Sequence, residues 1–212
     1  MSAPIPILFE DEHLLAVAKP AGLLSVPGAG RDLLAVLAEQ GRDALPVHRL
    51  DRDVSGIVLL ARDPAAQTAL QGLFRERAVE KTYWALAIGA PPRPSGEFKF
   101  PIDDNAAKAR VSAIGKPALT RWRVLRRHAR ATEFEVDLVT GRKNQIRLHF
   151  AHSGLPLAGE RKYARGKDDP YRFKRVALHA WRLGFRHPRT GAEIRLEAPL
   201  AADLVGLVER LD

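Results

Sequence analysis

One charged segment, residues 48–56 (His-Arg-Leu-Asp-Arg-Asp-Val-Ser-Gly), most restricts how this chain can fold. It places four charged residues and a glycine between two apolar runs, residues 44–47 and 57–61. Short apolar runs beside turn residues predict buried strands, so the charged segment should be a loop held between them. Catalytic groups are often found on such anchored loops. The alternative is an ordinary turn, in which Asp51 or Asp53 bonds local amides and Gly56 supplies an unusual dihedral angle.

The length suits one large globular domain or two small ones, and we expect a single domain, residues 1–212. The chain has 212 residues, of which 46% are hydrophobic and 28% charged, and this is enough to bury a sizeable core. No apolar run approaches the roughly 18 residues of a membrane span, and we expect no secretory signal at the N-terminus. Cysteine is absent, which excludes disulfides, thiolate metal sites and cysteine nucleophiles and agrees with a cytoplasmic location.

The charge balance favours a polyanionic partner. The net charge is +9, and an excess of this size is most often found in proteins that bind nucleic acid. Two segments concentrate it, since residues 161–175 contain seven Lys or Arg and residues 121–130 contain five Arg. Both segments are also compatible with ordinary solvated faces.

Turn and cap signals divide the rest of the chain into short elements. Helices are predicted where an acidic cap or a stop glycine marks an end: after Asp32, after Asp63-Pro64, between Gly141 and Gly154, and at residues 199–211. Strands are predicted where apolar and polar residues alternate between turns: residues 7–10, 14–18, 80–89, 98–102, 116–125, 132–139, 176–183 and 192–196.

The charged segment and four further motifs resemble those of the RluA family of pseudouridine synthases, in which His-Arg-Leu-Asp belongs to the catalytic motif. The further motifs have the same order in this chain: Lys19-Pro20-x-Gly22, Lys81-x-Tyr83, Thr140-Gly141-Arg142 continuing to His149, and Leu178-His179-Ala180. Residues 156–163 also match the family's "Pro-x-x-Gly-Asp-x-x-Tyr" element. The resemblance covers about residues 7–199. In this chain Val54 replaces the usual Thr, Asn144 a frequent His and Glu160 the Asp.

The resemblance implies an α+β fold: a pseudouridine synthase catalytic domain with a long, bent, mostly antiparallel mixed sheet flanked by helices, and an RNA cleft across its middle. It also implies a short form without the additional N-terminal RNA-binding domain of many relatives. A monomer is the default expectation. The implied substrates are uridines in tRNA stem-loops, in large-subunit ribosomal RNA, or in both.

The resemblance also implies an assignment of site residues. Asp51 matches the catalytic carboxylate, which either attacks the sugar or takes a C2′ proton. Arg147 matches the arginine that pairs with this carboxylate, and such a pair would keep it ionised despite burial. Tyr83 matches the tyrosine that stacks on the flipped uracil, where its hydroxyl could assist loss of the C5 proton.

Three further residues are implied to bind the substrate. Arg49 matches an arginine able to fill the gap that the flipped base leaves, which would offset part of the cost of unstacking. Ile146 and Leu178 would give the pocket apolar walls.

The isomerisation that the resemblance implies needs no cofactor, metal or activated donor. His149 and His152, three residues apart on a predicted helix, resemble metal ligands in their spacing. We favour structural histidines, because no third ligand lies at a suggestive spacing and cysteine is absent.

The basic composition is also compatible with two other functions. A catalytically silent RNA-binding or RNA-folding protein on the same scaffold would also be basic, but it would have little need of Asp51, Tyr83 and Arg147 together. A metal-dependent nuclease would fit the charge as well, but the sequence lacks a carboxylate cluster for two metal ions.

Overall fold

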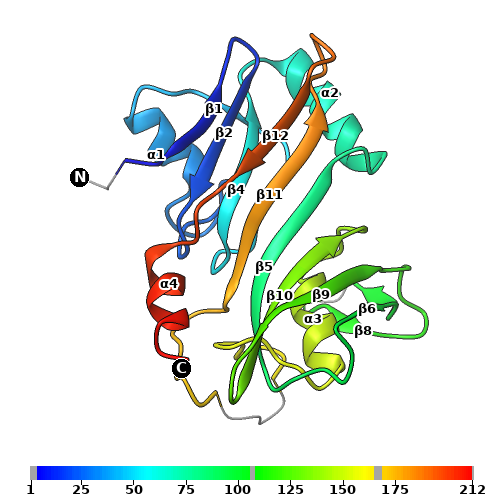
Figure 1. Ribbon diagram of the computed structural model, residues 1–212. Helices are drawn as coiled ribbons and strands as arrows, with labels where there is room; N and C mark the ends of the chain where they lie inside the picture. The colour runs from blue at the N-terminus through cyan, green and yellow to red at the C-terminus, as the bar shows by residue number, and fades with distance from the viewer. Residues whose placement is uncertain (1–3, 106–107, 165–168, 212) are drawn as a thin grey trace. The chain divides into compact units, whose positions relative to one another are not determined.

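The computed structural model describes residues 4–105, 108–164 and 169–211 (Figure 1). The chain divides into two compact units, each built from two segments. Unit 1 comprises Met1–Lys81 and Ala180–Ala201, and unit 2 comprises Thr82–His179 and Ala202–Asp212. The single domain expected for residues 1–212 stays a prediction.

Unit 1 is built on antiparallel strand pairs. Its elements, in chain order, are β1 (Ile7–Glu10), β2 (Leu14–Lys19), α1 (Leu33–Glu39), β3 (Leu45–Pro46), β4 (Ser55–Ala61), α2 (Pro64–Arg75), most of β11 (Leu178–Arg186) and β12 (Glu193–Glu197). Strand β2 pairs with β1 on one side and β4 on the other, β3 pairs with β4, and β11 pairs with β12 (Figure 1).

The core of unit 1 forms where these strands meet α2. All seven residues of β4 are buried, as expected for the apolar run after the charged segment. Leu70 of α2 is buried against Leu14 of β2, Leu59 of β4 and Leu183 of β11 in one apolar cluster. Both predicted helix starts are confirmed, because the side chains of Asp32 and Asp63 accept hydrogen bonds from backbone amides in the first turns of α1 and α2.

Unit 2 is a second antiparallel system. Its elements are most of β5 (Glu80–Ile88), then β6 (Ser95–Phe98), β7 (Ile102–Asp103), β8 (Arg110–Val111), β9 (Thr120–Arg127), β10 (Ala131–Leu138), α3 (Gln145–His152) and α4 (Ala202–Val208). Strand β10 pairs with both β5 and β9, and β6 pairs with β9 (Figure 1). Strands β7 and β8 form a separate short pair.

Aromatic side chains join α3 to these strands. Phe150 of α3 meets Phe134 of β10 edge to face, with ring centroids 5.1 Å apart, and Phe98 of β6 in the same way at 5.2 Å. Trp122 of β9 packs against Phe134 at 5.6 Å. Such pairs favour the edge-to-face arrangement, so they set how α3 lies on the sheet of unit 2.

Several element boundaries differ from those predicted. The strand expected at residues 98–102 is interrupted, because β6 ends at Phe98 and β7 begins at Ile102, just after Pro101, which has no amide to donate. The strand expected at 44–47 contains only Leu45–Pro46, and the one expected from residue 116 begins at Thr120. The C-terminal helix contains only Ala202–Val208 of the expected 199–211.

The α+β class is confirmed by these elements, in which every named strand pairing within a unit is antiparallel. The expected RNA cleft across the middle stays a prediction. Among the helices that the structure describes, none is both long and apolar enough to cross a membrane.

Candidate active site

Asp51 lies on a loop of unit 1 that is fixed at its start. The hydroxyl of Ser25 accepts a hydrogen bond from the backbone amide of Leu50 at 3.0 Å and donates one to the carbonyl of Leu50 at 3.1 Å. The carbonyl of Asp51 accepts from the amide of Val54 at 3.1 Å, which closes a tight turn. Leu50 and Val54 are buried, while Asp51 is half-buried and Arg49 exposed. The loop thus presents Asp51 and Arg49 between buried anchors.

The residue after Asp51 is fixed as well. The carbonyl of Arg52 accepts hydrogen bonds from the amide of Gly22 at 2.8 Å and from the ammonium of Lys19 at 3.3 Å. The ammonium of Lys19 also donates to the carbonyls of Pro20 and Leu23, both at 2.8 Å, and the residue is only 1% exposed. A buried ammonium bonded to three backbone carbonyls indicates a structural role for Lys19.

His48 is a structural member of the same segment. Its Nε2 accepts a hydrogen bond from the amide of Leu59 in β4 at 2.9 Å, and its ring stacks on Phe74 of α2 with centroids 4.5 Å apart. Burial, together with the nearby charge of Lys81, lowers the pKa of His48 to about 3. The imidazole is therefore neutral at physiological pH and ties the loop to its strand.

The other predicted site residues lie in unit 2. Tyr83 is in β5 opposite Val136 of β10 and is 9% exposed. Ile146 and Arg147 are neighbours on α3, and Leu178 is the first residue of β11. Ile146 and Leu178 are each 4% exposed, so both are apolar groups from which a buried wall can form.

Arg147 is held by a carboxylate that the sequence did not single out as functional. Its Nε donates to Glu160 at 2.6 Å and its Nη2 donates to the second oxygen of Glu160 at 2.9 Å. The Glu160 side chain is completely buried. The predicted pair of Arg147 with Asp51 would join the two units and stays a prediction. The side-on pair with Glu160 uses two of the five guanidinium N–H groups.

The start of α3 is braced by Gln145, which is 2% exposed. Its amide oxygen accepts from the hydroxyl of Thr140 at 2.7 Å and from the amide of Arg142 at 3.0 Å. Its amide nitrogen donates to the carbonyl of Leu119 at 2.9 Å and to the hydroxyl of Thr120 at 3.0 Å. Four bonds saturate the amide, so the residues that follow, Ile146 and Arg147, start from a fixed helix end.

The contacts of His149 and His152 do not support a role as metal ligands. Both ring nitrogens of His149 are engaged, Nδ1 with the hydroxyl of Thr120 and Nε2 with the carbonyl of Phe100, each at 2.9 Å. His152 packs on the ring of Phe100 with centroids 4.5 Å apart. Within the part of the chain that the structure describes, no group of three His, Cys, Asp or Glu is arranged to hold a metal ion.

The five arginines of the basic segment at 121–130 are exposed, in β9 and in the turn after it. Part of its charge is neutralised locally, since Arg123 forms a side-on pair with Glu135 at 2.6 and 2.9 Å and Arg121 lies 3.8 Å from Glu97. The segment at 161–175 includes residues 165–168, which lie outside the described part of the chain. Both segments remain candidates for phosphate contacts.

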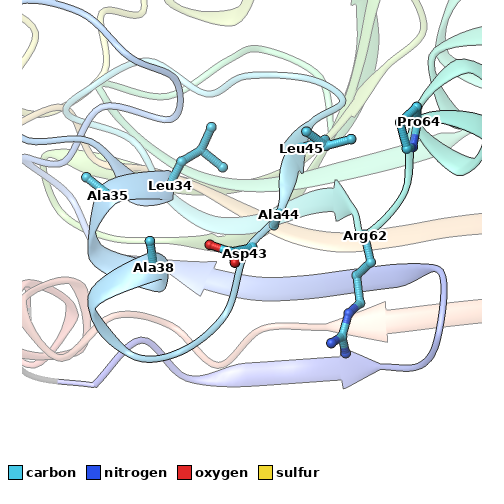
Figure 2. A pocket seen from close by; sticks show the side chains of 8 residues that line it. All are labelled: Leu34, Ala35, Ala38, Asp43, Ala44, Leu45, Arg62 and Pro64. Carbon is cyan, nitrogen blue, oxygen red and sulfur yellow. The ribbon is translucent and has the colours of Figure 1, made fainter.

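Unit 1 also contains a cavity of about 540 Å³ beside α1 (Figure 2). Its walls come from Leu34, Ala35 and Ala38 of α1 and from the β3 region, with Arg62 at one end. None of the six predicted site residues lines this cavity. The cavity is open and its walls are largely apolar, with one acidic and one basic residue, Asp43 and Arg62. These features do not identify a ligand.

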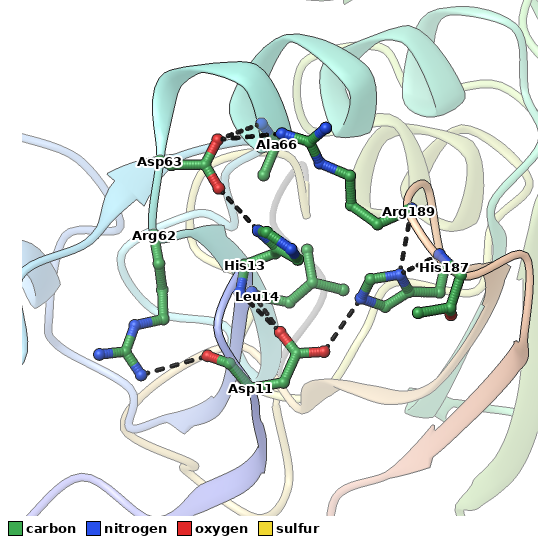
Figure 3. Close-up of polar contacts among 9 residues, drawn as sticks. Asp11, His13, Leu14, Arg62, Asp63, Ala66, His187 and Arg189 are labelled. Carbon is green, nitrogen blue, oxygen red and sulfur yellow. Dashed lines mark hydrogen bonds and ion pairs between the residues drawn. The ribbon is translucent and has the colours of Figure 1, made fainter.

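A cluster of polar side chains joins three segments of unit 1 (Figure 3). His13 Nδ1 lies 3.0 Å from Asp63, and His187 Nε2 lies 3.0 Å from Asp11. Burial acts to raise the pKa of Asp11, but amide hydrogen bonds from His13 and Leu14 and the contact with His187 leave this pKa below its usual value. The cluster thus ties the β1–β2 turn to the start of α2 and to the turn after β11.

The six predicted residues therefore form two groups, Arg49 and Asp51 in unit 1 and Tyr83, Ile146, Arg147 and Leu178 in unit 2. Sequence reasoning missed Glu160 as a partner of Arg147. The available signal was its place in the "Pro-x-x-Gly-Asp" element, directly after Gly159, but thirteen residues separate it from Arg147.

Comparison with known proteins agrees with the motifs. The sequence model of the family described as "RNA pseudouridylate synthase" matches residues 13–152. The ribosomal large subunit pseudouridine synthase D of Nitrosomonas europaea is 37% identical over 98% of this chain and 65% of its own length. The enzyme of the same name from Xanthomonas campestris is 39% identical over 98% of this chain and 70% of its own length. The chain thus spans about two thirds of the length of these curated relatives.

Solved structures show the same fold. "Human RNA Pseudouridylate Synthase Domain Containing 4" superposes with a TM-score of 0.81 at 28% identity, covering 97% of this chain and 92% of its own. "Human RNA Pseudouridylate Synthase Domain Containing 1" has a TM-score of 0.78 at 23% identity, covering 98% and 94%. The family match covers well over half of the chain and includes the His48–Gly56 motif, Tyr83 and Arg147. The resemblance predicted from the motifs is confirmed, and the chain belongs to the RNA pseudouridylate synthase family.

Proposed function

We propose that this protein is an RNA pseudouridine synthase that isomerises specific uridines in large-subunit ribosomal RNA, in tRNA, or in both. The observation that carries the proposal is the loop around Asp51, because the backbone groups of its neighbours Leu50 and Arg52 each take part in two hydrogen bonds. A carboxylate on a loop whose backbone is held in this way, in a member of this family, is preorganised for chemistry on a nucleotide. The names of the curated relatives favour ribosomal RNA as a substrate.

In the proposed reaction uracil leaves C1′, rotates and is reattached through C5. Asp51 acts on the sugar, as nucleophile at C1′ or as base at C2′. Arg147 pairs with Asp51 and keeps its carboxylate ionised beside the substrate. Tyr83 stacks on the detached uracil and assists loss of the C5 proton.

Three further residues bind the RNA in this proposal. The exposed side chain of Arg49 fills the space of the flipped base, and Ile146 and Leu178 give the base apolar walls. Basic residues of the segments at 121–130 and 161–175 contact phosphates without reading the sequence. The proposed active form is a monomer, and the proposed reaction uses neither a metal nor a cofactor.

The test is tritium release from RNA labelled at uracil C5. Ribosomal RNA and total tRNA are taken from a strain that lacks this protein, and wild type is compared with Asp51→Asn. We expect release by the wild type and a fall of about 10²–10⁴-fold in the variant, the range usual for loss of a group that transfers protons. Fractionation of the RNA then identifies the target.

Asp53→Asn is the matched control, because it removes the same charge from an exposed position of the same loop and should leave the rate unchanged. Equal release by wild type and Asp51→Asn would show that the catalytic residue is assigned wrongly. No release by either protein, with RNA binding intact, would favour the catalytically silent binding protein, which the names of the relatives do not support.

A further inference from the structure

Glu160 is a buried carboxylate, and both of its oxygens accept hydrogen bonds. Its two oxygens accept from Nε and Nη2 of Arg147 at 2.6 and 2.9 Å. The oxygen that faces Nη2 also accepts from the backbone amides of Lys162 and Tyr163 at 2.7 and 3.1 Å. Two backbone amides thus hold the carboxylate, and the carboxylate holds the guanidinium.

We propose that Glu160 is a positioning residue that fixes the orientation of the Arg147 guanidinium for the isomerisation. The inference rests on the proposed function, in which Arg147 is the partner of the catalytic carboxylate. Glu160 itself is not assigned a contact with the substrate.

The geometry of the Arg147–Glu160 pair determines how the guanidinium is oriented. A guanidinium is planar, and binding through Nε and Nη2 sets both the direction of the side chain and the rotation of its plane. The N–H groups of the opposite, end-on edge then point in one defined direction. A carboxylate paired with that edge, as proposed for Asp51, would meet donors whose orientation is already set, so little reorganisation remains during the reaction.

The backbone around Glu160 is built for this placement. Gly159 has φ +73°, and a Cβ at this position would collide with the backbone carbonyl of Arg175 and come within 3.1 Å of the carbonyl oxygen of Phe173. The amide of Gly159 donates to the side chain of Asp169 at 3.0 Å. Only glycine fits this close approach, and the tight turn delivers Glu160 to Arg147 from a rigid segment.

Tyr163 supports the guanidinium from another direction. The guanidinium carbon of Arg147 lies 5.6 Å from the centre of the Tyr163 ring, and Asn144 donates to the Tyr163 hydroxyl at 2.9 Å. Tyr163 is 9% exposed, in an apolar cluster with Leu148. Glu160 therefore holds Arg147 within the plane of its guanidinium, and the buried ring of Tyr163 lies beside it.

A purely stabilising role accounts less well for this arrangement. The desolvation of two buried charges largely cancels their attraction, so a buried ion pair contributes little net stability compared with apolar residues of the same volume. The orientation of a catalytic group gives a reason to keep such a pair, since a displacement of about 1 Å can lower a rate about 10²-fold.

The test compares Glu160→Gln with Glu160→Asp in the tritium-release assay. Glutamine has one oxygen and would place its amide nitrogen against a guanidinium N–H, so kcat should fall about 10²-fold, with KM for RNA changed less than about threefold. Aspartate keeps the charge and both oxygens, so it should restore kcat to within about tenfold of wild type. Glu135→Gln is the matched control, because it breaks the side-on pair with Arg123, which has the same two distances, and should leave kcat unchanged.

A second readout follows Arg147 directly. In ¹⁵N-labelled protein the Nε–H signal of Arg147, assigned with Arg147→Lys, should exchange slowly with solvent in the wild type and in Glu135→Gln, and rapidly in Glu160→Gln. If Glu160→Gln does not fold, Glu160→Asp serves instead, with exchange and kcat expected to change together.

Glu160→Gln with wild-type kcat, or with a still-protected Arg147 signal, would overturn the inference. The same holds if Glu135→Gln lowers kcat equally, since the effect would then belong to any lost ion pair. If the wild type releases no tritium, the proposed function fails, and hydrogen exchange alone then decides whether Glu160 fixes Arg147.

Discussion

Replacing Gly56 with alanine should destabilise unit 1 strongly, and the structure separates the two causes. Gly56 is the last residue of the charged segment and pairs with Lys19 across β4 and β2. Its φ is +114°, and a Cβ would lie 2.6 Å from the backbone nitrogen and 2.7 Å from the carbonyl carbon of Ala180. These are backbone atoms, so no rotation of a side chain can relieve the contact.

The expected cost follows from adding the two effects. A non-glycine residue at this dihedral angle costs about 1–3 kcal/mol, and forcing extra volume into packed backbone costs about 1–3 kcal/mol more. The total, about 2–6 kcal/mol, is a large part of the stability of a typical domain. For a chain of this size it corresponds to a fall in Tm of about 5–20 °C.

Gly191→Ala is the matched control. Gly191 also has a positive φ, +70°, but among the described residues no atom lies within 4 Å of a Cβ built there. Only the dihedral cost of about 1 kcal/mol should remain, a fall of about 2–4 °C. Both variants are unfolded thermally and in urea. If Gly56→Ala loses no more stability than Gly191→Ala, the close approach to Ala180 does not limit this position.

Two further predictions concern buried polar side chains. The pKa of His48 is about 3 in the folded state and near 6.5 when unfolded, so the unfolded chain binds the extra proton and stability falls as pH drops from 6.5 towards 3. Between pH 6 and 4 the wild type should lose about 2 kcal/mol more than His48→Gln in urea titrations, and parallel losses would contradict this. Gln145→Ala should lower the free energy of unfolding by about 2–4 kcal/mol, because it leaves several buried partners without a hydrogen bond. Gln67→Ala removes one bond to the carbonyl of Pro46 and should lower it by about 1 kcal/mol. Equal losses in the two variants would refute the bracing role of Gln145.

The parts of the fold that the sequence predicted well depend on local signals. The first turn forms because Asp11 accepts from the amides of His13 and Leu14 at 2.8 and 2.7 Å, all within four residues. The caps at Asp32 and Asp63 each act on an amide three residues ahead. Side-chain oxygens of this kind decide turns and helix starts with little help from the rest of the chain.

The parts predicted poorly depend on pairings between distant residues. Lys116 was expected to begin a long strand, but its amide and carbonyl are bonded to the backbone of Ile102 at 2.9 Å, in an isolated bridge. The chain joins β9 only at Thr120. The local sequence of residues 116–119 does not indicate this partner, because strand pairing also depends on the other strands of the sheet.

The candidate site shows the same division. Asp51, Tyr83 and Arg147 were assigned from motifs, each a short run of residues. The partner of Arg147 could not be found in this way, because the pair with Glu160 is created by the fold of unit 2. The three substitutions relative to the family pattern, Val54, Asn144 and Glu160, are far apart in the sequence, and only the structure shows that two of them share a neighbour.

Two of these substitutions, Asn144 and Glu160, meet at Tyr163. Asn144 has φ +56° at the start of α3, a conformation that asparagine adopts more readily than most residues, and its side chain donates to the Tyr163 hydroxyl. Glu160 accepts from the amide of Tyr163 and holds Arg147 beside the same ring. Since Tyr163 bonds to Asn144 through its hydroxyl and to Glu160 through its backbone amide, we expect a change at either position to alter the surroundings of Arg147. Asn144 and Glu160 therefore belong to one local arrangement around Tyr163. In it a carboxylate longer than the family's Asp reaches Arg147, and a polar side chain shorter than His reaches the Tyr163 hydroxyl.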